Sequence, residues 1–180
     1  MAKRTGVTSS EITERIKSAG SAERGSYNLS AATAEPLRRK LRGRWTVASH
    51  EVAGEAYLGR FIARSLKGLL LRQGAYRAEY EFKDRLCLKR VEISGILGEG
   101  EESAVYRYRL GVALSWDLAG PGLLSIRPEL GYQCTEIGGD AAAVKELDDA
   151  GEDVLVGFRF DGSDLVLEEG EDRKILERMP

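Results

Sequence analysis

Residues 104–136 alternate apolar and polar side chains over a long stretch, and this pattern constrains the fold more than any other. Between Tyr106 and Leu118 every even position is apolar or aromatic, and after the glycine and proline residues at 120–122 the alternation resumes. A period of two residues is typical of β-strands that bury one face and expose the other to water. The segment therefore predicts strands on both sides of a tight turn, with the even-numbered apolar residues through Cys134 facing a core.

Shorter alternating segments lie on both sides of this stretch. Residues 76–83 alternate aromatic and charged side chains, residues 154–160 alternate again, and residues 161–164 have the composition of a tight hairpin turn. The apolar parity changes within residues 86–93, and we expect a β-bulge near residues 89–90 to restore it.

Together these segments predict a mainly β fold. Eight or nine short antiparallel strands, with turns between most neighbours, indicate an up-and-down meander. Closing such a sheet into a barrel removes both of its edges. A β-sandwich is the alternative architecture.

Residues 55–73 change period, because their apolar side chains recur at spacings of three and four. This is the pattern of an amphipathic helix, inserted here between the first and second strands, with one face packed on the sheet. Near the barrel mouth such a helix would form a lid, whose residues over the opening are Phe61, Leu66 and Leu69. The opposite face would carry the basic residues Arg60, Arg64 and Lys67.

The N-terminal residues 1–35 are rich in Ser, Thr, Ala, Gly and charged side chains, which predicts a flexible tail before a barrel domain at 36–180. Pro36 can begin a short helical turn over residues 36–41. No apolar segment follows the basic first residues, and no run of about 18 apolar residues occurs. We therefore expect a cytoplasmic protein.

Charge and chemistry exclude several classes of function. The 27 basic and 29 acidic residues give a net charge of -2, so no basic excess recruits nucleic acid. Cys87 and Cys134 have no second ligand close in sequence and are expected to be buried free thiols. His50, the single histidine, has no triad pattern beside it and is interpreted as a partly exposed residue at a strand end. We expect no metal, no cofactor and no catalytic residue.

Several segments, taken in order, resemble the lipocalin-like (calycin) barrels of small bacterial type. Gly43-Arg44-Trp45 follows a short helical turn, as the Gly-x-Trp of that family does. Tyr80-Glu81-Phe82-Lys83 resembles the second-strand pattern of the family. The hairpins at residues 116–126 and 160–167, with the final Leu176-Glu177-Arg178, are similar to its later strands. The resemblance covers residues 41–179.

The resemblance implies one structural contact, and the predicted barrel itself indicates what its interior could hold. An arginine of the last strand would cover a tryptophan of the first, which pairs Arg178 with Trp45 as a structural contact. The barrel interior would bind a ligand or be filled by its own side chains, since an eight-stranded barrel allows either. The interior residues are expected to be Tyr106, Tyr108, Leu114, Trp116, Leu124, Ile126, Tyr132 and Phe158.

Two functions follow as hypotheses. The first is non-enzymatic binding of a small hydrophobic or amphipathic ligand, such as a lipid, inside the barrel. The alternative is an interaction module with a filled core, whose basic helix face binds a protein partner or an anionic membrane surface. Calycin barrels sometimes host catalysis, but no constellation of residues in this sequence supports an enzyme.

Overall fold

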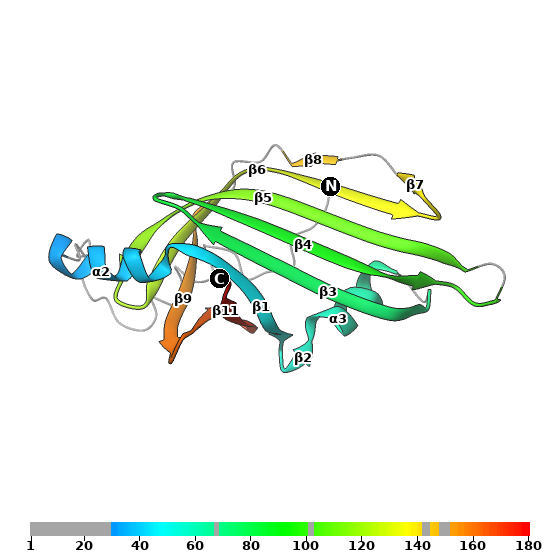
Figure 1. The fold of residues 1–180 in the computed structure, drawn as a ribbon, viewed down its shortest axis with the longest axis horizontal. Coiled ribbons are helices and arrows are strands. Elements are labelled where there is room, and N and C mark those ends of the chain that lie inside the picture. The colour runs from blue at the N-terminus through cyan, green and yellow to red at the C-terminus, as the bar shows by residue number, and fades with distance from the viewer. Residues whose placement is uncertain (1–29, 67–68, 101–102, 142–144, 148–151) are drawn as a thin grey trace.

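The computed structural model describes residues 30–66, 69–100, 103–141, 145–147 and 152–180. Within that part of the chain, eight antiparallel strands close into a barrel, because the last strand pairs back onto the first (Figure 1). In order around the barrel these strands are β1 (Gly43–Val52), β3 (Leu71–Phe82), β4 (Leu86–Leu97), β5 (Ala104–Gly120), β6 (Leu123–Ile137), β9 (Val154–Asp161), β10 (Asp164–Glu169) and β11 (Asp172–Arg178). The predicted mainly β barrel, with a helix after its first strand, is confirmed.

Three short strands and two helices complete the described structure. The short strands are β2 (Glu55–Ala56), β7 (Asp140–Ala141) and β8 (Lys145–Leu147), of which β7 and β8 pair with β6. The helices are α2 (Ala31–Leu41), which precedes β1, and α3 (Tyr57–Ser65), which follows β2. None of the helices in the described residues is both long enough and apolar enough to span a membrane.

The strands differ greatly in length, and this difference divides the molecule into two ends. Strands β3 to β6 have 12 to 17 residues, whereas β9 to β11 have 6 to 8. Strand β1 pairs with β3 only over residues 43–46, and β6 pairs with β9 only over residues 123–126. Strands β3 to β6 therefore extend beyond the barrel as a sheet, with α3 on one side (Figure 1).

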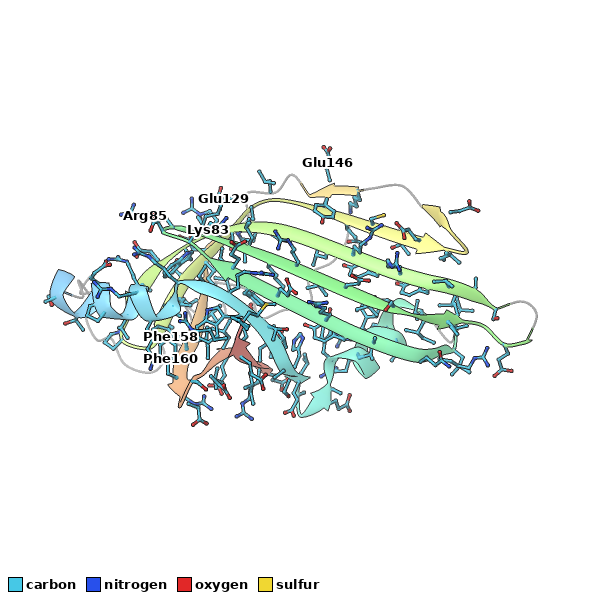
Figure 2. All side chains as sticks on the ribbon, viewed as in Figure 1. Lys83, Arg85, Glu129, Glu146, Phe158 and Phe160 are labelled. Atoms are coloured by element: carbon cyan, nitrogen blue, oxygen red, sulfur yellow. The ribbon has the colours of Figure 1, made fainter. Side chains whose placement is uncertain are left out.

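The closed end, where all eight strands meet, has a densely packed apolar core. Trp45 is 1% exposed, and its indole nitrogen donates a hydrogen bond to the Leu41 carbonyl of α2 at 2.8 Å. Phe158 of β9 belongs to the same core and packs edge-on against Phe160 (Figure 2). The remaining buried members are Leu41, Tyr80, Phe82, Cys87, Leu114, Trp116, Leu124, Val156, Leu165, Leu167 and Leu176.

The open end, where β3 to β6 extend alone, has a separate apolar core between the sheet and α3. Its buried members are Leu66, Leu71, Ala78, Val91, Ile93, Leu97 and Tyr106. No residue of α3 itself is buried, although Tyr57, Leu58, Phe61 and Ile62 pack against this core from one side. The helix therefore covers the open end without being enclosed by it.

The helix is shorter than the predicted range 55–73. It ends at Ser65 with Leu66 as its C-terminal cap, and β3 begins at Leu71. Leu71 pairs with Leu97 of β4. The apolar spacing from this residue onward also fits a helix, but its backbone joins the sheet instead. Leu69, which lies between the two elements, is 53% exposed.

Helix α2 is longer than the predicted turn, and the boundary expected at residue 35 falls inside it. The Ser30 carbonyl accepts hydrogen bonds from the amides of Thr33 and Ala34, so the first turn forms ahead of Pro36. The predicted tail over residues 1–29 lies outside the described residues.

The predicted bulge in β4 and the predicted inward face of the second half of β6 are both wrong. Strand β4 pairs with β3 and β5 without a bulge at residues 89–90, so Lys89 shares the inner face with Cys87 and Val91. The bulge lies instead in β6, where Leu114 and Ala113 of β5 pair with Pro128 and Leu130. The extra residue, Glu129, reverses which β6 side chains face inward.

Candidate ligand-binding site

A pocket of about 570 Å³ lies at the open end, between α3 and the inner face of β5 and β6. Phe61, Ser65, Leu66 and Leu69 line it on the helix side. Leu97, Tyr106, Tyr108, Gln133, Thr135 and Ile137 line it on the sheet side. Most of these side chains are apolar or aromatic, and a few amide and hydroxyl groups lie among them.

The bulge in β6 decides which side chains reach the pocket. On β5 the even positions Tyr106 and Tyr108 face inward, and they pair with Ile137 and Thr135 of β6. Without the extra residue at Glu129, the even positions of β6 would face inward instead. The bulge therefore replaces a tyrosine, a cysteine and a glutamate (Tyr132, Cys134 and Glu136) with a glutamine, a threonine and an isoleucine (Gln133, Thr135 and Ile137) in the pocket wall.

The structure divides the predicted interior residues into three groups. Tyr106 and Tyr108 line the pocket. The core of the closed end contains Leu114, Trp116, Leu124, Ile126 and Phe158. Tyr132 was expected inside, but it is 48% exposed, and its ring lies where a Cβ on Gly111 would be. This correction follows from the bulge, which turns Tyr132 to the outer face.

The predicted lid residues Phe61, Leu66 and Leu69 all line the pocket. The predicted basic face is less uniform. The Arg60 guanidinium donates a hydrogen bond to the Val52 carbonyl at 2.7 Å, so it ties α3 to the end of β1. Arg64 is exposed on the helix, and Lys67 lies outside the described residues.

A polar cluster around His50 lies next to this open-end core, and no local sequence pattern indicates it. The His50 side chain is 5% exposed, and its Nε2 and Nδ1 atoms lie 3.0 Å from an Asp172 carboxylate oxygen and 2.8 Å from the Tyr76 hydroxyl. A carboxylate only accepts hydrogen bonds, so in neutral His50 Nε2 carries the proton and Nδ1 accepts from Tyr76. The same Asp172 oxygen accepts from Lys174, which is 7% exposed.

The cluster joins four elements of the fold. Tyr57, the first residue of α3, stacks on the His50 ring with centroids 4.1 Å apart and an interplanar angle of 10°. His50 belongs to β1, Tyr76 to β3 and Asp172 to β11. Because β1 and β3 no longer pair at this level, side chains of the cluster bridge the gap between them and hold the start of α3.

Burial sets the electrostatics of the cluster. Loss of solvent lowers the pKa of His50 below its usual 6.5, although the Asp172 carboxylate opposes the shift. Hydrogen bonds from His50 and Lys174 hold the pKa of Asp172 at about 2, against the opposing effect of burial. Burial also raises the pKa of Tyr76 far above its usual range, so Tyr76 stays a neutral hydroxyl at neutral pH.

An aromatic row connects the cluster to the pocket. The Tyr57 and Phe61 ring centroids are 6.3 Å apart, and those of Phe61 and Tyr108 are 5.2 Å apart. Tyr57 contacts His50 at one end of the row, and Phe61 and Tyr108 line the pocket at the other. The first helical turns of α3 thus carry side chains from the polar cluster to the pocket.

Arg178 lies over Trp45 at the closed end, as the family resemblance implies. Its guanidinium carbon is 4.5 Å from the Trp45 ring centroid. The same group donates hydrogen bonds to the carbonyls of Arg42, at 3.1 Å, and Lys40. A Cβ on Gly43 would come within 3.0 Å of this guanidinium, which explains the glycine before the arginine and tryptophan.

The described residues contain no group of three or more His, Cys, Asp and Glu side chains that could hold a metal ion. Cys87 and Cys134 are buried free thiols, and burial raises the pKa of Cys87 to about 12.

Comparison with known proteins found no matching family model, no similar curated protein and no similar solved structure.

Proposed function

We propose that this chain is a non-enzymatic, lipocalin-like binding protein that takes up a small hydrophobic or amphipathic molecule in the pocket under α3. The single observation that carries the proposal is the pocket itself. Its volume of about 570 Å³ lies within the range of small-molecule sites. Apolar walls with a few hydroxyl and amide groups suit a mostly apolar ligand with a limited polar part.

Exposure of apolar side chains at the pocket supports this proposal. Leu69 is 53% exposed and Ile137 is 44% exposed, and both line the pocket. Water in contact with these side chains is unfavourable, and an apolar ligand would displace it. By contrast, the closed end offers packed side chains, so we place the ligand at the open end.

The proposal is tested with N-phenyl-1-naphthylamine, an uncharged probe whose fluorescence rises in apolar surroundings. We expect saturable binding to the full chain. Thr135 faces the pocket from β6, so Thr135→Trp should fill part of the space and weaken probe binding at least about tenfold, or about 1.4 kcal/mol.

Val105 supplies the matched control, because it precedes Tyr106 on the same sheet and is 61% exposed. Val105→Trp adds the same ring on the outer face and should leave probe binding unchanged. Equal weakening by both variants, or no saturable binding to the wild-type chain, would show that the pocket is not a binding site.

The alternative function, an interaction module that uses the basic helix face, has no comparable observation in its favour. Arg60 directs its guanidinium at the Val52 carbonyl of its own chain. Binding of a protein or membrane partner by Arg64 and Lys67 is a separate hypothesis. It is tested by reversing the charge of both residues and measuring whether the partner is still recovered with the chain.

A further inference from the structure

Lys89 is a cation on the inner wall of the barrel. It stands between Cys87 and Val91 on β4, which are 0% and 6% exposed and face inward. Its ammonium lies 5.8 Å from the centroid of the Tyr80 ring, and Tyr80 is its partner on β3. The side chain thus points into the molecule, whereas its neighbour Arg90 is exposed.

Among the described residues, Lys89 has neither a hydrogen bond nor an ion pair. The nearby carboxylate of Asp172 is already shared by Lys174 and His50. Lys89 acts electrostatically on His50, Tyr57 and Cys87. Burial lowers the pKa of His50, so His50 is neutral at neutral pH and adds no charge of its own. Two lysine ammonium groups and one carboxylate thus act on His50, and the carboxylate contacts Lys174 rather than Lys89.

Lys89 is partly buried, and a charge that is partly removed from water is unfavourable unless an opposite charge reaches it. Glu81 and Glu169 are the other acidic groups that act on this region. Glu81 forms an ion pair with Lys83, and neither carboxylate forms an ion pair with Lys89 in the described part of the chain.

The position of Lys89 relative to the pocket sets the shape of a ligand that could use both. Lys89 pairs with Val112 of β5, and Tyr108 of the pocket wall lies four residues further along that strand. At about 3.3 Å per residue this separation is about 13 Å. The Tyr57 and Phe61 rings form a row with Tyr108, so a ligand that reached both Lys89 and the pocket would be narrow and elongated and would displace Phe61.

From these positions we infer that the ligand is an elongated amphipathic anion, whose alkyl tail occupies the pocket under α3 and whose single negative head group pairs with Lys89. The inference rests on the proposed function and adds the charge and shape of the ligand. The head would contact the Lys89 ammonium, with the Tyr57 and Tyr80 side chains beside it. A compact apolar molecule would fill the pocket but leave Lys89 unpaired.

The test compares three molecules with the same alkyl chain and different heads: decanoate, 1-decanol and decylammonium. Each displaces N-phenyl-1-naphthylamine from the full chain at neutral pH. We expect decanoate to bind at least about tenfold more tightly than 1-decanol, because a charge-assisted contact is worth more than a neutral one. Decylammonium should bind more weakly than both.

Lys89→Met removes the charge while keeping a long apolar stem, and Arg90→Met makes the same change on the outer face. We expect Lys89→Met to erase the preference for decanoate over 1-decanol and to leave 1-decanol binding unchanged, whereas Arg90→Met should keep the preference. A urea denaturation curve shows whether each variant folds, and Lys89→Gln replaces Lys89→Met if the latter does not.

The outcomes separate this inference from the function on which it rests. If the probe and 1-decanol bind but decanoate binds no better, or if Lys89→Met keeps the preference, the anionic ligand is wrong and the apolar pocket stands. If the probe and all three molecules fail to bind the wild-type chain, both proposals are wrong.

Discussion

The closed end and the open end of this molecule share strands β3 to β6, yet they differ in how they bury their side chains. At the closed end eight strands and α2 enclose one core, and the two largest fully buried side chains, Trp45 and Phe82, lie there. At the open end β3 to β6 have a single cover, and no residue within that cover, α3, is buried. Dense packing and available space are thus found in different places.

The polar groups follow the same division. Tyr57, Tyr76, Tyr106, Tyr108 and His50 gather at or beside the open end, where hydroxyl and imidazole groups can meet water or a ligand. The closed-end core has tryptophan and phenylalanine beside one buried tyrosine, Tyr80, and the two indole nitrogens donate to backbone carbonyls. Stability should therefore depend mainly on the closed end and ligand binding on the open end. Mutations at one end should change one property and leave the other nearly unchanged.

The largest expected difference is between Trp45→Ala and Phe61→Ala. Trp45 is 1% exposed in the closed-end core, and removing such a side chain leaves a cavity that costs about 3–5 kcal/mol of unfolding free energy. Phe61 is only partly buried on α3, so its loss should cost about 1 kcal/mol. Urea denaturation of both variants measures the two values.

The affinity for the probe should show the reverse, with a larger effect of Phe61→Ala than of Trp45→Ala. Phe61→Ala should change N-phenyl-1-naphthylamine affinity, because Phe61 lines the pocket. Any Trp45→Ala protein that still folds should bind the probe as the wild type does. If Phe61→Ala destabilises the chain as much as Trp45→Ala, the open end shares the core of the closed end and the division is wrong.

The sequence supports the fold better than it supports the site, for a physical reason. Alternation along β5 and the order of turns are local properties, and they predict a barrel with a helix after its first strand. The helix end near Ser65 was missed because residues 66–71 satisfy both a helical and a strand pattern, and only pairing with β4 decides between them. The bulge at Glu129 was missed because a phase shift depends on the partner strand.

The candidate site depends on contacts between residues far apart in the chain. Phe61, Leu66, Leu69, Tyr106 and Tyr108 could be proposed from their spacing, and the structure brings these five together. His50 and Asp172 are separated by 122 residues, so no local pattern could indicate that they meet. Lys89 is in phase with the buried Cys87 and Val91, but a bulge at residues 89–90, as the sequence predicts, would place it in the opposite phase.

A smaller effect is expected from the cation over the closed end. Arg178→Ala removes the contact with the Trp45 ring and two hydrogen bonds to backbone carbonyls, which should cost about 1–2 kcal/mol of unfolding free energy. Arg159, which forms an exposed ion pair with Glu168, is the control, and Arg159→Ala should change stability by less than about 0.5 kcal/mol. Probe binding should be unchanged in both variants, and equal stabilities would show that Arg178 is only a surface charge.

The smallest effect is a pH dependence that acts on the open end. The pKa of His50 is lower in the folded chain than its usual 6.5, so the unfolded chain binds the proton first as the pH falls. The free energy of unfolding should therefore decrease from about pH 6.5 downward. Asp172, with its pKa lowered from 3.8 to about 2, adds a second decrease only between those two values, so the two groups act in separate pH ranges.

His50→Gln tests this pH dependence, because a glutamine amide can still donate to Asp172 and accept from Tyr76 but does not titrate. Its free energy of unfolding should be flat from pH 6.5 to 5, where the wild type loses stability.

In the wild type a protonated His50 would add a third positive charge, with Lys89 and Lys174, beside the single carboxylate of Asp172. Tyr57 of α3 stacks on the His50 ring. Hydrogen exchange of the α3 amides should therefore accelerate below pH 6.5, beyond the change in intrinsic exchange rates, while that of β10 does not. Acceleration at both ends, or at neither, would mean that His50 does not hold the helix to the barrel.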